Sequence, residues 1–255
     1  MHLESESDEN KSFVNWLLDI GNGSNTSQLQ NTILLSKYIK VEPDIQSLIK
    51  AVYSNIEQQN LSDDFLQDRM LLSARNDDVQ DINNIVLDIF PGHKYTYLSA
   101  DNIIIEDGAD NTNVYPIEYL NSLNPSGMPP SKLDLKIGCP IMLLHNLAHR
   151  QGICNGFRLI VVQLSDHVIE ARILSGSCAE NLAFIPRITL TPSSTELLFK
   201  FKRRQFPVWC AFAITINKSQ GQSLKHVGLD LRTSVFSHGQ LYIALSRCTS
   251  AQSIK

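Results

Sequence analysis

The sequence lacks three features that would each assign it to a class of protein. The first is positive charge: 22 lysines and arginines stand against 26 aspartates and glutamates, a net charge of −4. No field of the whole chain therefore attracts nucleic acid, and any such contact must come from local patches. The second is paired cysteine, because five scattered cysteines form no C-x-x-C motif. We expect reduced thiols, mostly in the core of an intracellular protein.

The third missing feature is a long apolar run: none approaches the ~18 residues that a membrane span needs. The acidic start MHLESESDEN does not have the pattern of a signal peptide. We therefore expect a soluble protein with no membrane partner, and disorder over residues 1–11. His145 and His149 lie four residues apart between Cys139 and Cys154, but this spacing matches no common zinc site, so we expect no metal.

The residues that are present predict a mixed α/β chain. A length of 255 residues with 43% apolar residues allows one large domain or two small ones with a substantial core. Apolar residues at helical spacing predict helices over residues 13–20 and 45–52. A buried strand at Met70–Ala74 is followed by a helix that we expect Asp77 or Asp78 to cap. A strand, a polar turn and a capped helix form one unit of a parallel sheet.

From Lys132 to Thr191 the pattern changes to short strands. The segments LDLKIG, CPIMLLHN, FRLIVVQL, HVIEARIL and FIPRITL follow at short intervals, separated by glycines or polar turns. This spacing predicts a small β-barrel. The densest basic run, KFKRRQ at 200–205, comes next. It could follow a nucleic-acid backbone, act as a nuclear localisation signal or be solvated surface.

A cluster of polar residues then follows a second buried strand, predicted over residues 208–214. The cluster contains a glycine and consists of Thr215, Asn217, Lys218, Ser219, Gln220, Gly221 and Gln222. Open α/β sheets place ligand-binding groups at the carboxyl ends of their strands. The cluster is therefore a candidate binding site, although Lys218 could also be a solvated surface lysine.

A helix with a fixed arginine is predicted near the end of the chain. A strand at Val227–Leu231 is followed by a capping box, Ser237-x-x-Gln240, and by an apolar stripe that predicts a docked helix over Gln240–Cys248. Arg247 lies on another side of this helix. An arginine so fixed is suited to meeting a phosphate brought by another surface. It could also only close the helix through the C-terminal dipole.

Several of these segments resemble superfamily 1B DNA helicases, specifically the Pif family and its relatives inside Helitron transposons. TINKSQGQ and FSHGQLYIALSR resemble motifs V and VI, nearly verbatim over 215–222 and 236–247. FVNWLLDIGNG is similar to the segment after motif III, RMLLSARNDD to motif IV, and YTYLSADNI to a further Pif-family block. LKIGCPIMLLHNLAHRQGICNGFRLIVV resembles the insert called 2B. Ala74 departs from the family's usual proline, and His145 from its usual arginine or lysine.

The resemblance implies an α/β fold: a RecA-like second helicase domain, in which helices flank a parallel sheet, with an inserted small Src-homology-3-like β-barrel. Domain 2A would cover residues 1–131 and 207–255, and the 2B barrel residues 132–206. Asn76, Thr215, Asn217 and Lys218 would then contact DNA, and Gln220, Gly221 and Arg247 would bind the nucleotide. Arg247 would also be the catalytic arginine finger.

One half of such a helicase is missing from the sequence. It contains neither the GxxxxGK[ST] loop that cradles phosphates nor the acidic pair that holds Mg²⁺. We expect either a fragment of a longer gene or a decayed mobile-element copy. ATP and Mg²⁺ would act in the full-length enzyme, and this chain alone would bind neither. Its partners would be single-stranded DNA and the missing N-terminal RecA-like domain.

The predicted function is the C-terminal motor half of a 5′-to-3′ ATP-dependent DNA helicase. The family implies roles in DNA repair, recombination and telomere maintenance, and hence a nuclear location. Two alternatives stay open from the sequence. The chain could be a non-enzymatic module that binds single-stranded DNA, or an inactive remnant of a Helitron-type transposon helicase.

Overall fold

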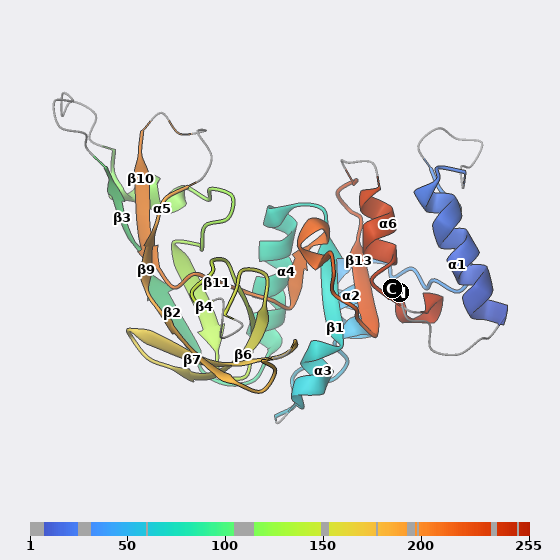
Figure 1. Cartoon of the computed structure of the whole chain (residues 1–255), viewed down its shortest axis with the longest axis horizontal. Helices are drawn as coiled ribbons and strands as arrows, with labels where there is room; N and C mark the ends of the chain where they lie inside the picture. Colours follow the sequence, from blue (N-terminus) through green and yellow to red (C-terminus); the bar gives the residue numbers. More distant parts are fainter. Residues whose placement is uncertain are drawn as a thin grey trace. The chain divides into compact units, whose positions relative to one another are not determined.

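The computed structural model divides the chain into two compact units (Figure 1). It describes residues 8–24, 32–59, 61–104, 115–148, 153–176, 178–192, 197, 199–235, 239–248 and 250–255. The first unit, here called the parallel unit, combines Met1–Pro91 with Phe212–Lys255, and the second, the antiparallel unit, is Gly92–Ala211. Within the described part of the chain, every helix is too short or too polar to cross a membrane.

The parallel unit is built on a three-stranded parallel sheet of order β12-β1-β13. Its strands are β1 (Arg69–Ser73), β12 (Ala213–Thr215) and β13 (His226–Asp230). Its helices are α1 (Asp8–Gly21), α2 (Ile45–Val52), α3 (Asp63–Gln67), α4 (Asn76–Ile89) and α6 (Gln240–Leu245), with 3₁₀ turns η2 (Ile216–Ser219) and η3 (Ala251–Ser253).

The central strand β1 forms the core of the parallel unit. Met70, Leu71 and Leu72 are fully buried, as expected for a strand with neighbours on both edges and helices nearby. Helix α2 packs against β13 and α4 against β12. The Asn83 side chain of α4 donates from Nδ2 to the carbonyl oxygen of Ala213 (3.0 Å) and accepts the Ala213 N–H at Oδ1 (2.8 Å). These two bonds fix α4 to the edge strand.

Three predictions for the parallel unit need correction. Helix α1 begins at Asp8, so residues 8–11 are helical rather than disordered; extending an established helix into a polar stretch costs little. Helix α4 begins at Asn76 with Arg75 at the N-cap and no side-chain cap bond, so Asp77 and Asp78 lie in the first turn instead of capping it. Helix α6 ends at Leu245, three residues early. The predicted cap Ser237 lies outside the described residues.

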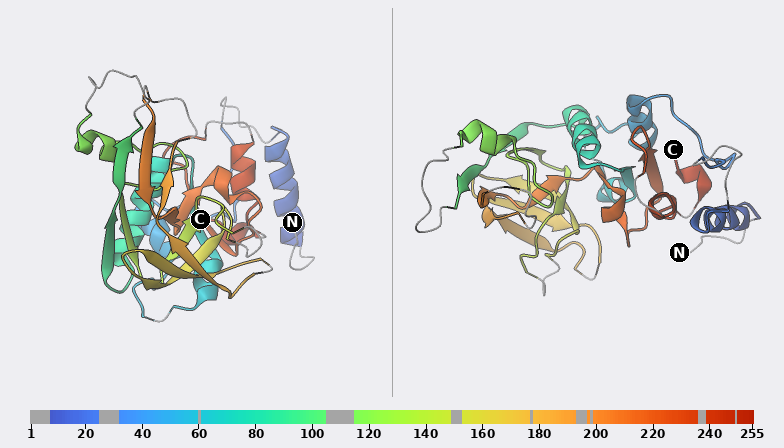
Figure 2. Two further views of the ribbon diagram at one scale, coloured as in Figure 1. Left: turned by 60° about the vertical axis from the view of Figure 1, so that its left-hand side comes forward. Right: turned by 90° about the horizontal axis from the view of Figure 1, so that it is seen from above.

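The antiparallel unit contains strands β2 to β11 and helix α5 (Figure 2). The strands are β2 (Lys94–Leu98), β3 (Ala100–Ile103), β4 (Lys132–Lys136), β5 (Pro140–Leu143), β6 (Arg158–Leu164), β7 (Val168–Ile173), β8 (Leu182–Pro186), β9 (Ile188–Leu190), β10 (Phe201–Gln205) and β11 (Val208–Cys210), and α5 is Ile117–Ser122. They form antiparallel sheets of order β11-β5-β6-β7-β8, β3-β10-β9 and β2-β4. The predicted mixture of a parallel sheet and short antiparallel strands is confirmed.

The apolar run at 208–214 is not one strand, as predicted, but two. Strand β11 pairs antiparallel with β5, whereas β12 pairs parallel with β1. Both halves are rich in apolar residues, so the sequence pattern gives no sign of the change of partner at Ala211 and Phe212. The boundaries of the antiparallel unit, Gly92 and Ala211, also lie outside the expected 132–206. They do so because β2 pairs with β4 and β3 with β10.

The five cysteines carry reduced thiols. Cys139 and Cys248 are buried, but Cys154, Cys178 and Cys210 are only half-buried, so the prediction that most lie in the core is wrong. Burial raises the pKa of the Cys248 thiol to about 12. A thiol with such a pKa is almost fully protonated at neutral pH and therefore a poor nucleophile.

Candidate functional site

The carboxyl ends of the three parallel strands bring a row of polar residues together. Strand register places Ser73 of β1 beside Thr215 of β12 on one side and beside Asp230 of β13 on the other. Ser73 is fully buried and Asp230 is 3% exposed, whereas Thr215 is half-buried. This edge is where open α/β sheets bind ligands. The predicted residue Thr215 therefore sits at the end of a row whose other two members the sequence analysis missed.

An arginine closes one end of this row. Arg232 donates from Nε to Asp230 Oδ1 and from Nη2 to Asp230 Oδ2, both at 2.9 Å. Burial alone would raise the pKa of the Asp230 carboxyl, but hydrogen bonds from Arg232 and Ser73 and the Arg232 charge hold this pKa below its ordinary value. The Ser73 hydroxyl also lies 3.5 Å from Asp78 Oδ2. The strand end is therefore a connected polar network built around a bidentate ion pair.

The segment after β12 presents the predicted polar cluster. In the 3₁₀ turn η2, Ile216 and Ser219 are buried, whereas Asn217 is exposed and Lys218 is half-buried. Burial lowers the pKa of the Lys218 ammonium group. Gln220 is exposed, and Gly221, also exposed, has a φ of +87°. The turn thus displays an amide and a partly desolvated cation beside a glycine that few other residues could replace without strain.

Arg247 is bound to this same segment. Its Nη1 donates to the carbonyl oxygens of Gln222 (3.1 Å) and Ser219 (3.3 Å), the residues on either side of Gln220 and Gly221. The structure therefore brings together the three residues that were predicted to bind a nucleotide. The half-buried position of Arg247 lowers the pKa of its guanidinium. The group nevertheless stays charged at neutral pH, because the ordinary pKa of an arginine side chain lies far above 7.

Arg247 also makes local contacts at the end of α6. Its Nε donates to the Ile243 carbonyl oxygen (2.9 Å) and its Nη2 to Ser246 Oγ (3.1 Å). The contact with Ile243, four residues earlier, is the helix-closing interaction that the sequence left open as an alternative. A phosphate that approached Arg247 would have to compete with these acceptors.

Asn76 lies near the same edge of the sheet. It is the first residue of α4, is exposed and follows the end of β1 by three residues. Its neighbours Arg75 and Asp77 form an exposed ion pair at 3.7 Å. Asn76, Thr215, Asn217 and Lys218 thus all belong to the parallel unit and adjoin the ends of the adjacent strands β1 and β12.

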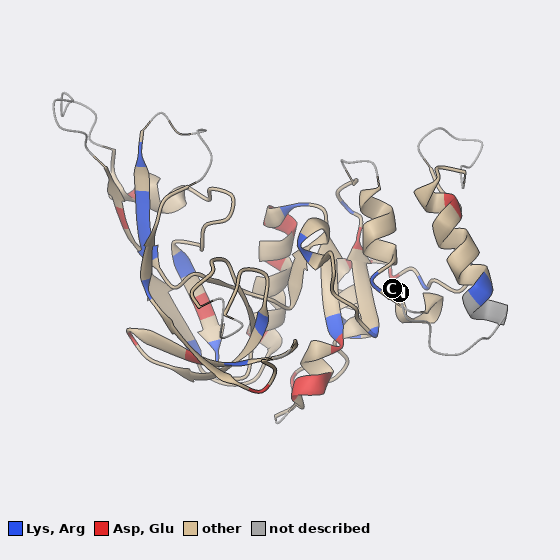
Figure 3. Cartoon of the chain, viewed as in Figure 1, with Lys and Arg blue, Asp and Glu red and all other residues tan. Residues whose placement is uncertain are grey.

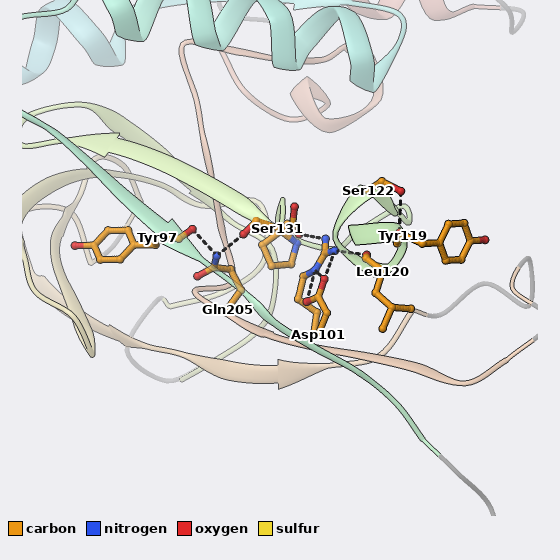
Figure 4. Close-up of polar contacts among 9 residues, drawn as sticks. Tyr97, Asp101, Tyr119, Leu120, Ser122, Ser131 and Gln205 are labelled. Carbon is orange, nitrogen blue, oxygen red and sulfur yellow. Dashed lines mark hydrogen bonds and ion pairs between the residues drawn. The ribbon is translucent and has the colours of Figure 1, made fainter. Parts of the chain in front are cut away.

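The basic run KFKRRQ lies in the antiparallel unit, and one of its cations is not available to a ligand. Arg203 is fully buried and donates to both carboxylate oxygens of Asp101, at 2.9 Å from Nε to Oδ1 and 2.6 Å from Nη2 to Oδ2. It also donates to the carbonyl oxygens of Pro129 (3.0 Å) and Leu120 (3.1 Å); Figure 4 draws the contacts around Asp101 and Leu120. Whichever use of the run applies, Arg203 therefore neither contacts a nucleic-acid backbone nor lies on a solvated surface. Alternation along β10 turns its side chain inward.

Comparison with known proteins identifies the family. The family description "DNA helicase Pif1, 2B domain" matches residues 118–164. The chain is 31% identical to the ATP-dependent DNA helicase PIF1 of Mus musculus over 187 residues, which is 72% of this chain and 26% of the relative. The chain is a region of a Pif1-family DNA helicase. It is also 31% identical to the ATP-dependent DNA helicase Pif1 of Bdellovibrio bacteriovorus over 165 residues, 65% of this chain and 35% of the relative.

Solved Pif1 structures share the fold of this Pif1-family region. The Bacteroides Pif1 helicase in complex with ADP-AlF3 and ssDNA matches with a TM-score of 0.59 at 23% identity, over 98% of this chain and 49% of that chain. The Pif1 helicase of Candida albicans matches with a TM-score of 0.57 at 19% identity, over 96% and 53%. The chain thus spans about a quarter of the mouse relative's length and about half of these solved chains. The predicted family is confirmed, while the roles of single residues stay predictions.

A metal site does not emerge from the described residues. None of their histidine, cysteine, aspartate and glutamate side chains gather in a group of three or more that could hold a metal ion. His145 is half-buried, and His149 lies outside the described residues. Two acidic residues of the strand-end network, Asp78 and Asp230, are bonded to Ser73 and Arg232.

Proposed function

We propose that this Pif1-family region is the second, RecA-like motor domain of a 5′-to-3′ ATP-dependent DNA helicase, with the 2B insert as a small Src-homology-3-like barrel. The division expected from the sequence gives domain 2A residues 1–131 and 207–255, and 2B residues 132–206. The pairing of β2 with β4 and of β3 with β10 argues for moving the two boundaries outward, to Gly92 and Ala211.

The observation that carries this proposal is the shared location of both groups of candidate residues. The segment from Thr215 to Gln222 begins at the strand-end row and continues to the carbonyl groups that Arg247 binds. A ligand on one part of this segment would therefore affect the other. Such coupling of DNA contact to nucleotide contact is what a DNA-driven motor requires, because each ligand must bias the same structural element.

Single-stranded DNA is the proposed ligand of the first group. Lys218 would bind a phosphate, and the side chains of Asn76, Thr215 and Asn217 would donate hydrogen bonds to phosphate or sugar oxygens. These interactions position a strand but do not read its sequence. Binding a phosphate would also offset the unfavourable burial of the Lys218 charge. Among the solved relatives, Bacteroides Pif1 is bound to ssDNA.

A nucleotide phosphate is the proposed ligand of the second group. Arg247 supplies a cation, Gln220 an amide, and Gly221 a backbone with open space around its Cα; these groups fit an oxyanion. They do not fit Mg²⁺, since none of them is a carboxylate. ATP, when bound in the full-length enzyme, supplies the phosphoryl group that is transferred. Arg247 would turn Nη1 from Ser219 and Gln222 toward it while Nε stays anchored on Ile243, as an arginine finger worth ~10³–10⁵ in rate in tested NTPases.

A non-enzymatic module that binds single-stranded DNA is the second candidate. It is favoured by one observation: the Arg247 guanidinium already bonds to protein acceptors at Nε, Nη1 and Nη2. In that case Arg247 would serve only to hold the segment 219–222 in place. An inactive remnant of a Helitron-type helicase would keep the fold and lose the DNA contacts as well.

Titration of a labelled oligothymidine at several salt concentrations tests the proposal. Each phosphate of a single strand that a lysine or arginine neutralises contributes about −0.7 to the log–log salt slope, so Lys218, the cation of the first group, should contribute about −0.7. Lys218→Met keeps the apolar stem and removes the charge, so it should flatten the slope by about 0.7. Lys225→Met is the matched control, since that exposed lysine already pairs with Asp68 at 2.9 Å.

Three results would count against the proposal. Absence of binding at low salt would support the remnant instead. Tight, salt-insensitive and sequence-specific binding would contradict a motor domain that grips the backbone. An equal loss of slope in Lys218→Met and Lys225→Met would show that only net charge matters, and would remove Lys218 from the site.

A further inference from the structure

Strand β10 sorts the basic run KFKRRQ onto two faces of its sheet. Phe201, Arg203 and Gln205 are buried, while Lys202 is half-buried and Arg204 exposed. Lys200 precedes the strand, has the same parity as Lys202 and Arg204, and is exposed. Because side chains alternate between the faces of a strand, the three remaining cations share the outward face. Figure 3 shows the positive segments along β10.

The strands on either side present small uncharged residues to this outward face. In the antiparallel register, Lys202 lies opposite Asn102, and Arg204 lies opposite Ala100 on β3 and Thr189 on β9. All three opposing residues are exposed. Directly opposed residues share a face, so none of these opposed positions places a carboxylate beside Lys202 or Arg204. The acidic residue of β3, Asp101, is turned inward toward Arg203.

The inward face fixes the strand that carries the cations. Arg203 bonds to Asp101 and to two backbone carbonyls. Gln205 donates from Nε2 to the Tyr97 carbonyl oxygen at 3.0 Å, a contact drawn in Figure 4. Buried charge-assisted bonds fix the strand that carries the outward side chains, so only those side chains have to be ordered at the time of binding.

We propose that the outward face of the sheet β3-β10-β9 binds the phosphate backbone of single-stranded nucleic acid. This surface, the β10 cationic face, consists of Lys200, Lys202, Arg204, Ala100, Asn102 and Thr189. The inference rests on the proposed function and adds a separate contact zone, in the antiparallel unit, for a ligand of the same class.

The geometry of the β10 cationic face selects the ligand. Its cations recur every second residue, about 6.6 Å apart along the strand, in a single line that suits the repeated charges of one strand. The opposing residues on β3 and β9 carry no aromatic ring, so the face offers no stacking platform for bases. The binding should therefore depend on salt and not on sequence.

The test is the double substitution Lys202→Gln and Arg204→Gln in the whole chain, titrated with a labelled oligothymidine. Loss of two phosphate contacts should flatten the salt slope by about 1.4. The charge-retaining pair Lys202→Arg and Arg204→Lys should keep the slope. Lys132→Gln is the control on the same unit, because the charge of that exposed lysine is balanced by Asp134 at 3.6 Å. A thermal melt checks that each variant folds.

The outcomes separate this inference from the proposed function. An unchanged slope in the double variant, together with a weaker Lys218→Met, would overturn the β10 cationic face and leave the motor-domain site standing. An equal effect of Lys132→Gln would overturn it too. Equal affinity for a duplex of the same length, lost equally in the double variant, would exclude a single-strand surface. Absence of binding by the unmodified chain would overturn both proposals.

Discussion

At the scale of single residues, Lys218 combines a proposed DNA-binding position with an energetic cost. Burial lowers the pKa of its ammonium group from the ordinary value of 10.5, so the folded state disfavours the charge relative to the unfolded state. Below the folded pKa that cost is fully present, and as the pH rises to 10.5 it disappears. A residue kept at such a cost is a candidate for function.

We therefore expect Lys218→Met to stabilise the protein at pH 7 while it weakens DNA binding. Single stabilising substitutions commonly add about 0.5–2 kcal/mol to the free energy of unfolding. The gain over the unmodified chain should shrink as the pH approaches 10.5. Urea unfolding at pH 7 and pH 10 measures both effects. Lys225→Met, which removes an exposed ion pair, should cost about 0–1 kcal/mol instead. A Lys218→Met variant less stable than the unmodified chain would contradict the expectation.

Only some residues of the candidate functional site could be predicted from the sequence. The cluster from Thr215 to Gly221 could be predicted because its polar residues are contiguous after an apolar strand. Ser73 and Asp230 could not, because their alignment depends on the register of strands more than a hundred residues apart. The inward position of Arg203 could not be predicted for a related reason. A run of cations does not reveal that its middle member turns inward to an aspartate on another strand.

At the scale of elements, β13 must pass very close to α2 and β1. A Cβ added at Gly228 would lie 2.4 Å from Leu71 Cδ2 and 2.7 Å from Val52 Cγ2. These are buried side chains with little room to move. Gly228→Ala should therefore destabilise the fold by about 1–3 kcal/mol, the usual cost of overpacking. Urea unfolding followed by circular dichroism measures the loss.

Leu71→Ala supplies the matched test of that mechanism. It removes the atoms nearest to the new methyl group, so Gly228→Ala should cost less in the Leu71→Ala background than in the unmodified chain. The difference is the coupling energy of a double-mutant cycle, expected at about 0.5–3 kcal/mol for residues in contact. Equal costs in both backgrounds would show that the methyl group does not meet Leu71.

Elements with a purely local cause were predictable, and those that depend on partners were not. Helix α2, predicted over residues 45–52, begins where Asp44 accepts the Ser47 N–H at 2.8 Å, a contact between residues only three apart in the chain. The run 208–214, in contrast, gave no sign that β11 and β12 belong to different sheets. Its apolar residues satisfy burial in either sheet, and only the surrounding chain decides which partner each half takes.

At the scale of the whole molecule, the sequence contains no phosphate-cradling GxxxxGK[ST] segment. Within this Pif1-family region, the proposed nucleotide group of Arg247, Gln220 and Gly221 would offer one cation, one amide and one glycine to a phosphate. A single arginine cannot replace the backbone amides and the lysine that hold the β- and γ-phosphates in NTPases, nor the groups that hold Mg²⁺. We therefore expect the isolated chain to hydrolyse no ATP above background, with or without oligothymidine.

Phosphate release by the purified chain checks this last expectation, and two variants separate a real activity from a contaminant. Arg247→Ala removes the proposed finger, but it also removes the bonds to Ile243, Ser219 and Gln222 and so disturbs the fold. Gln220→Ala alters an exposed side chain and should leave the fold intact. DNA-stimulated phosphate release that falls in both variants would contradict the expectation, since it would mean that this region alone assembles a catalytic site. Release that is equal in all three proteins would identify a contaminant, because neither change affects an enzyme carried over from the host.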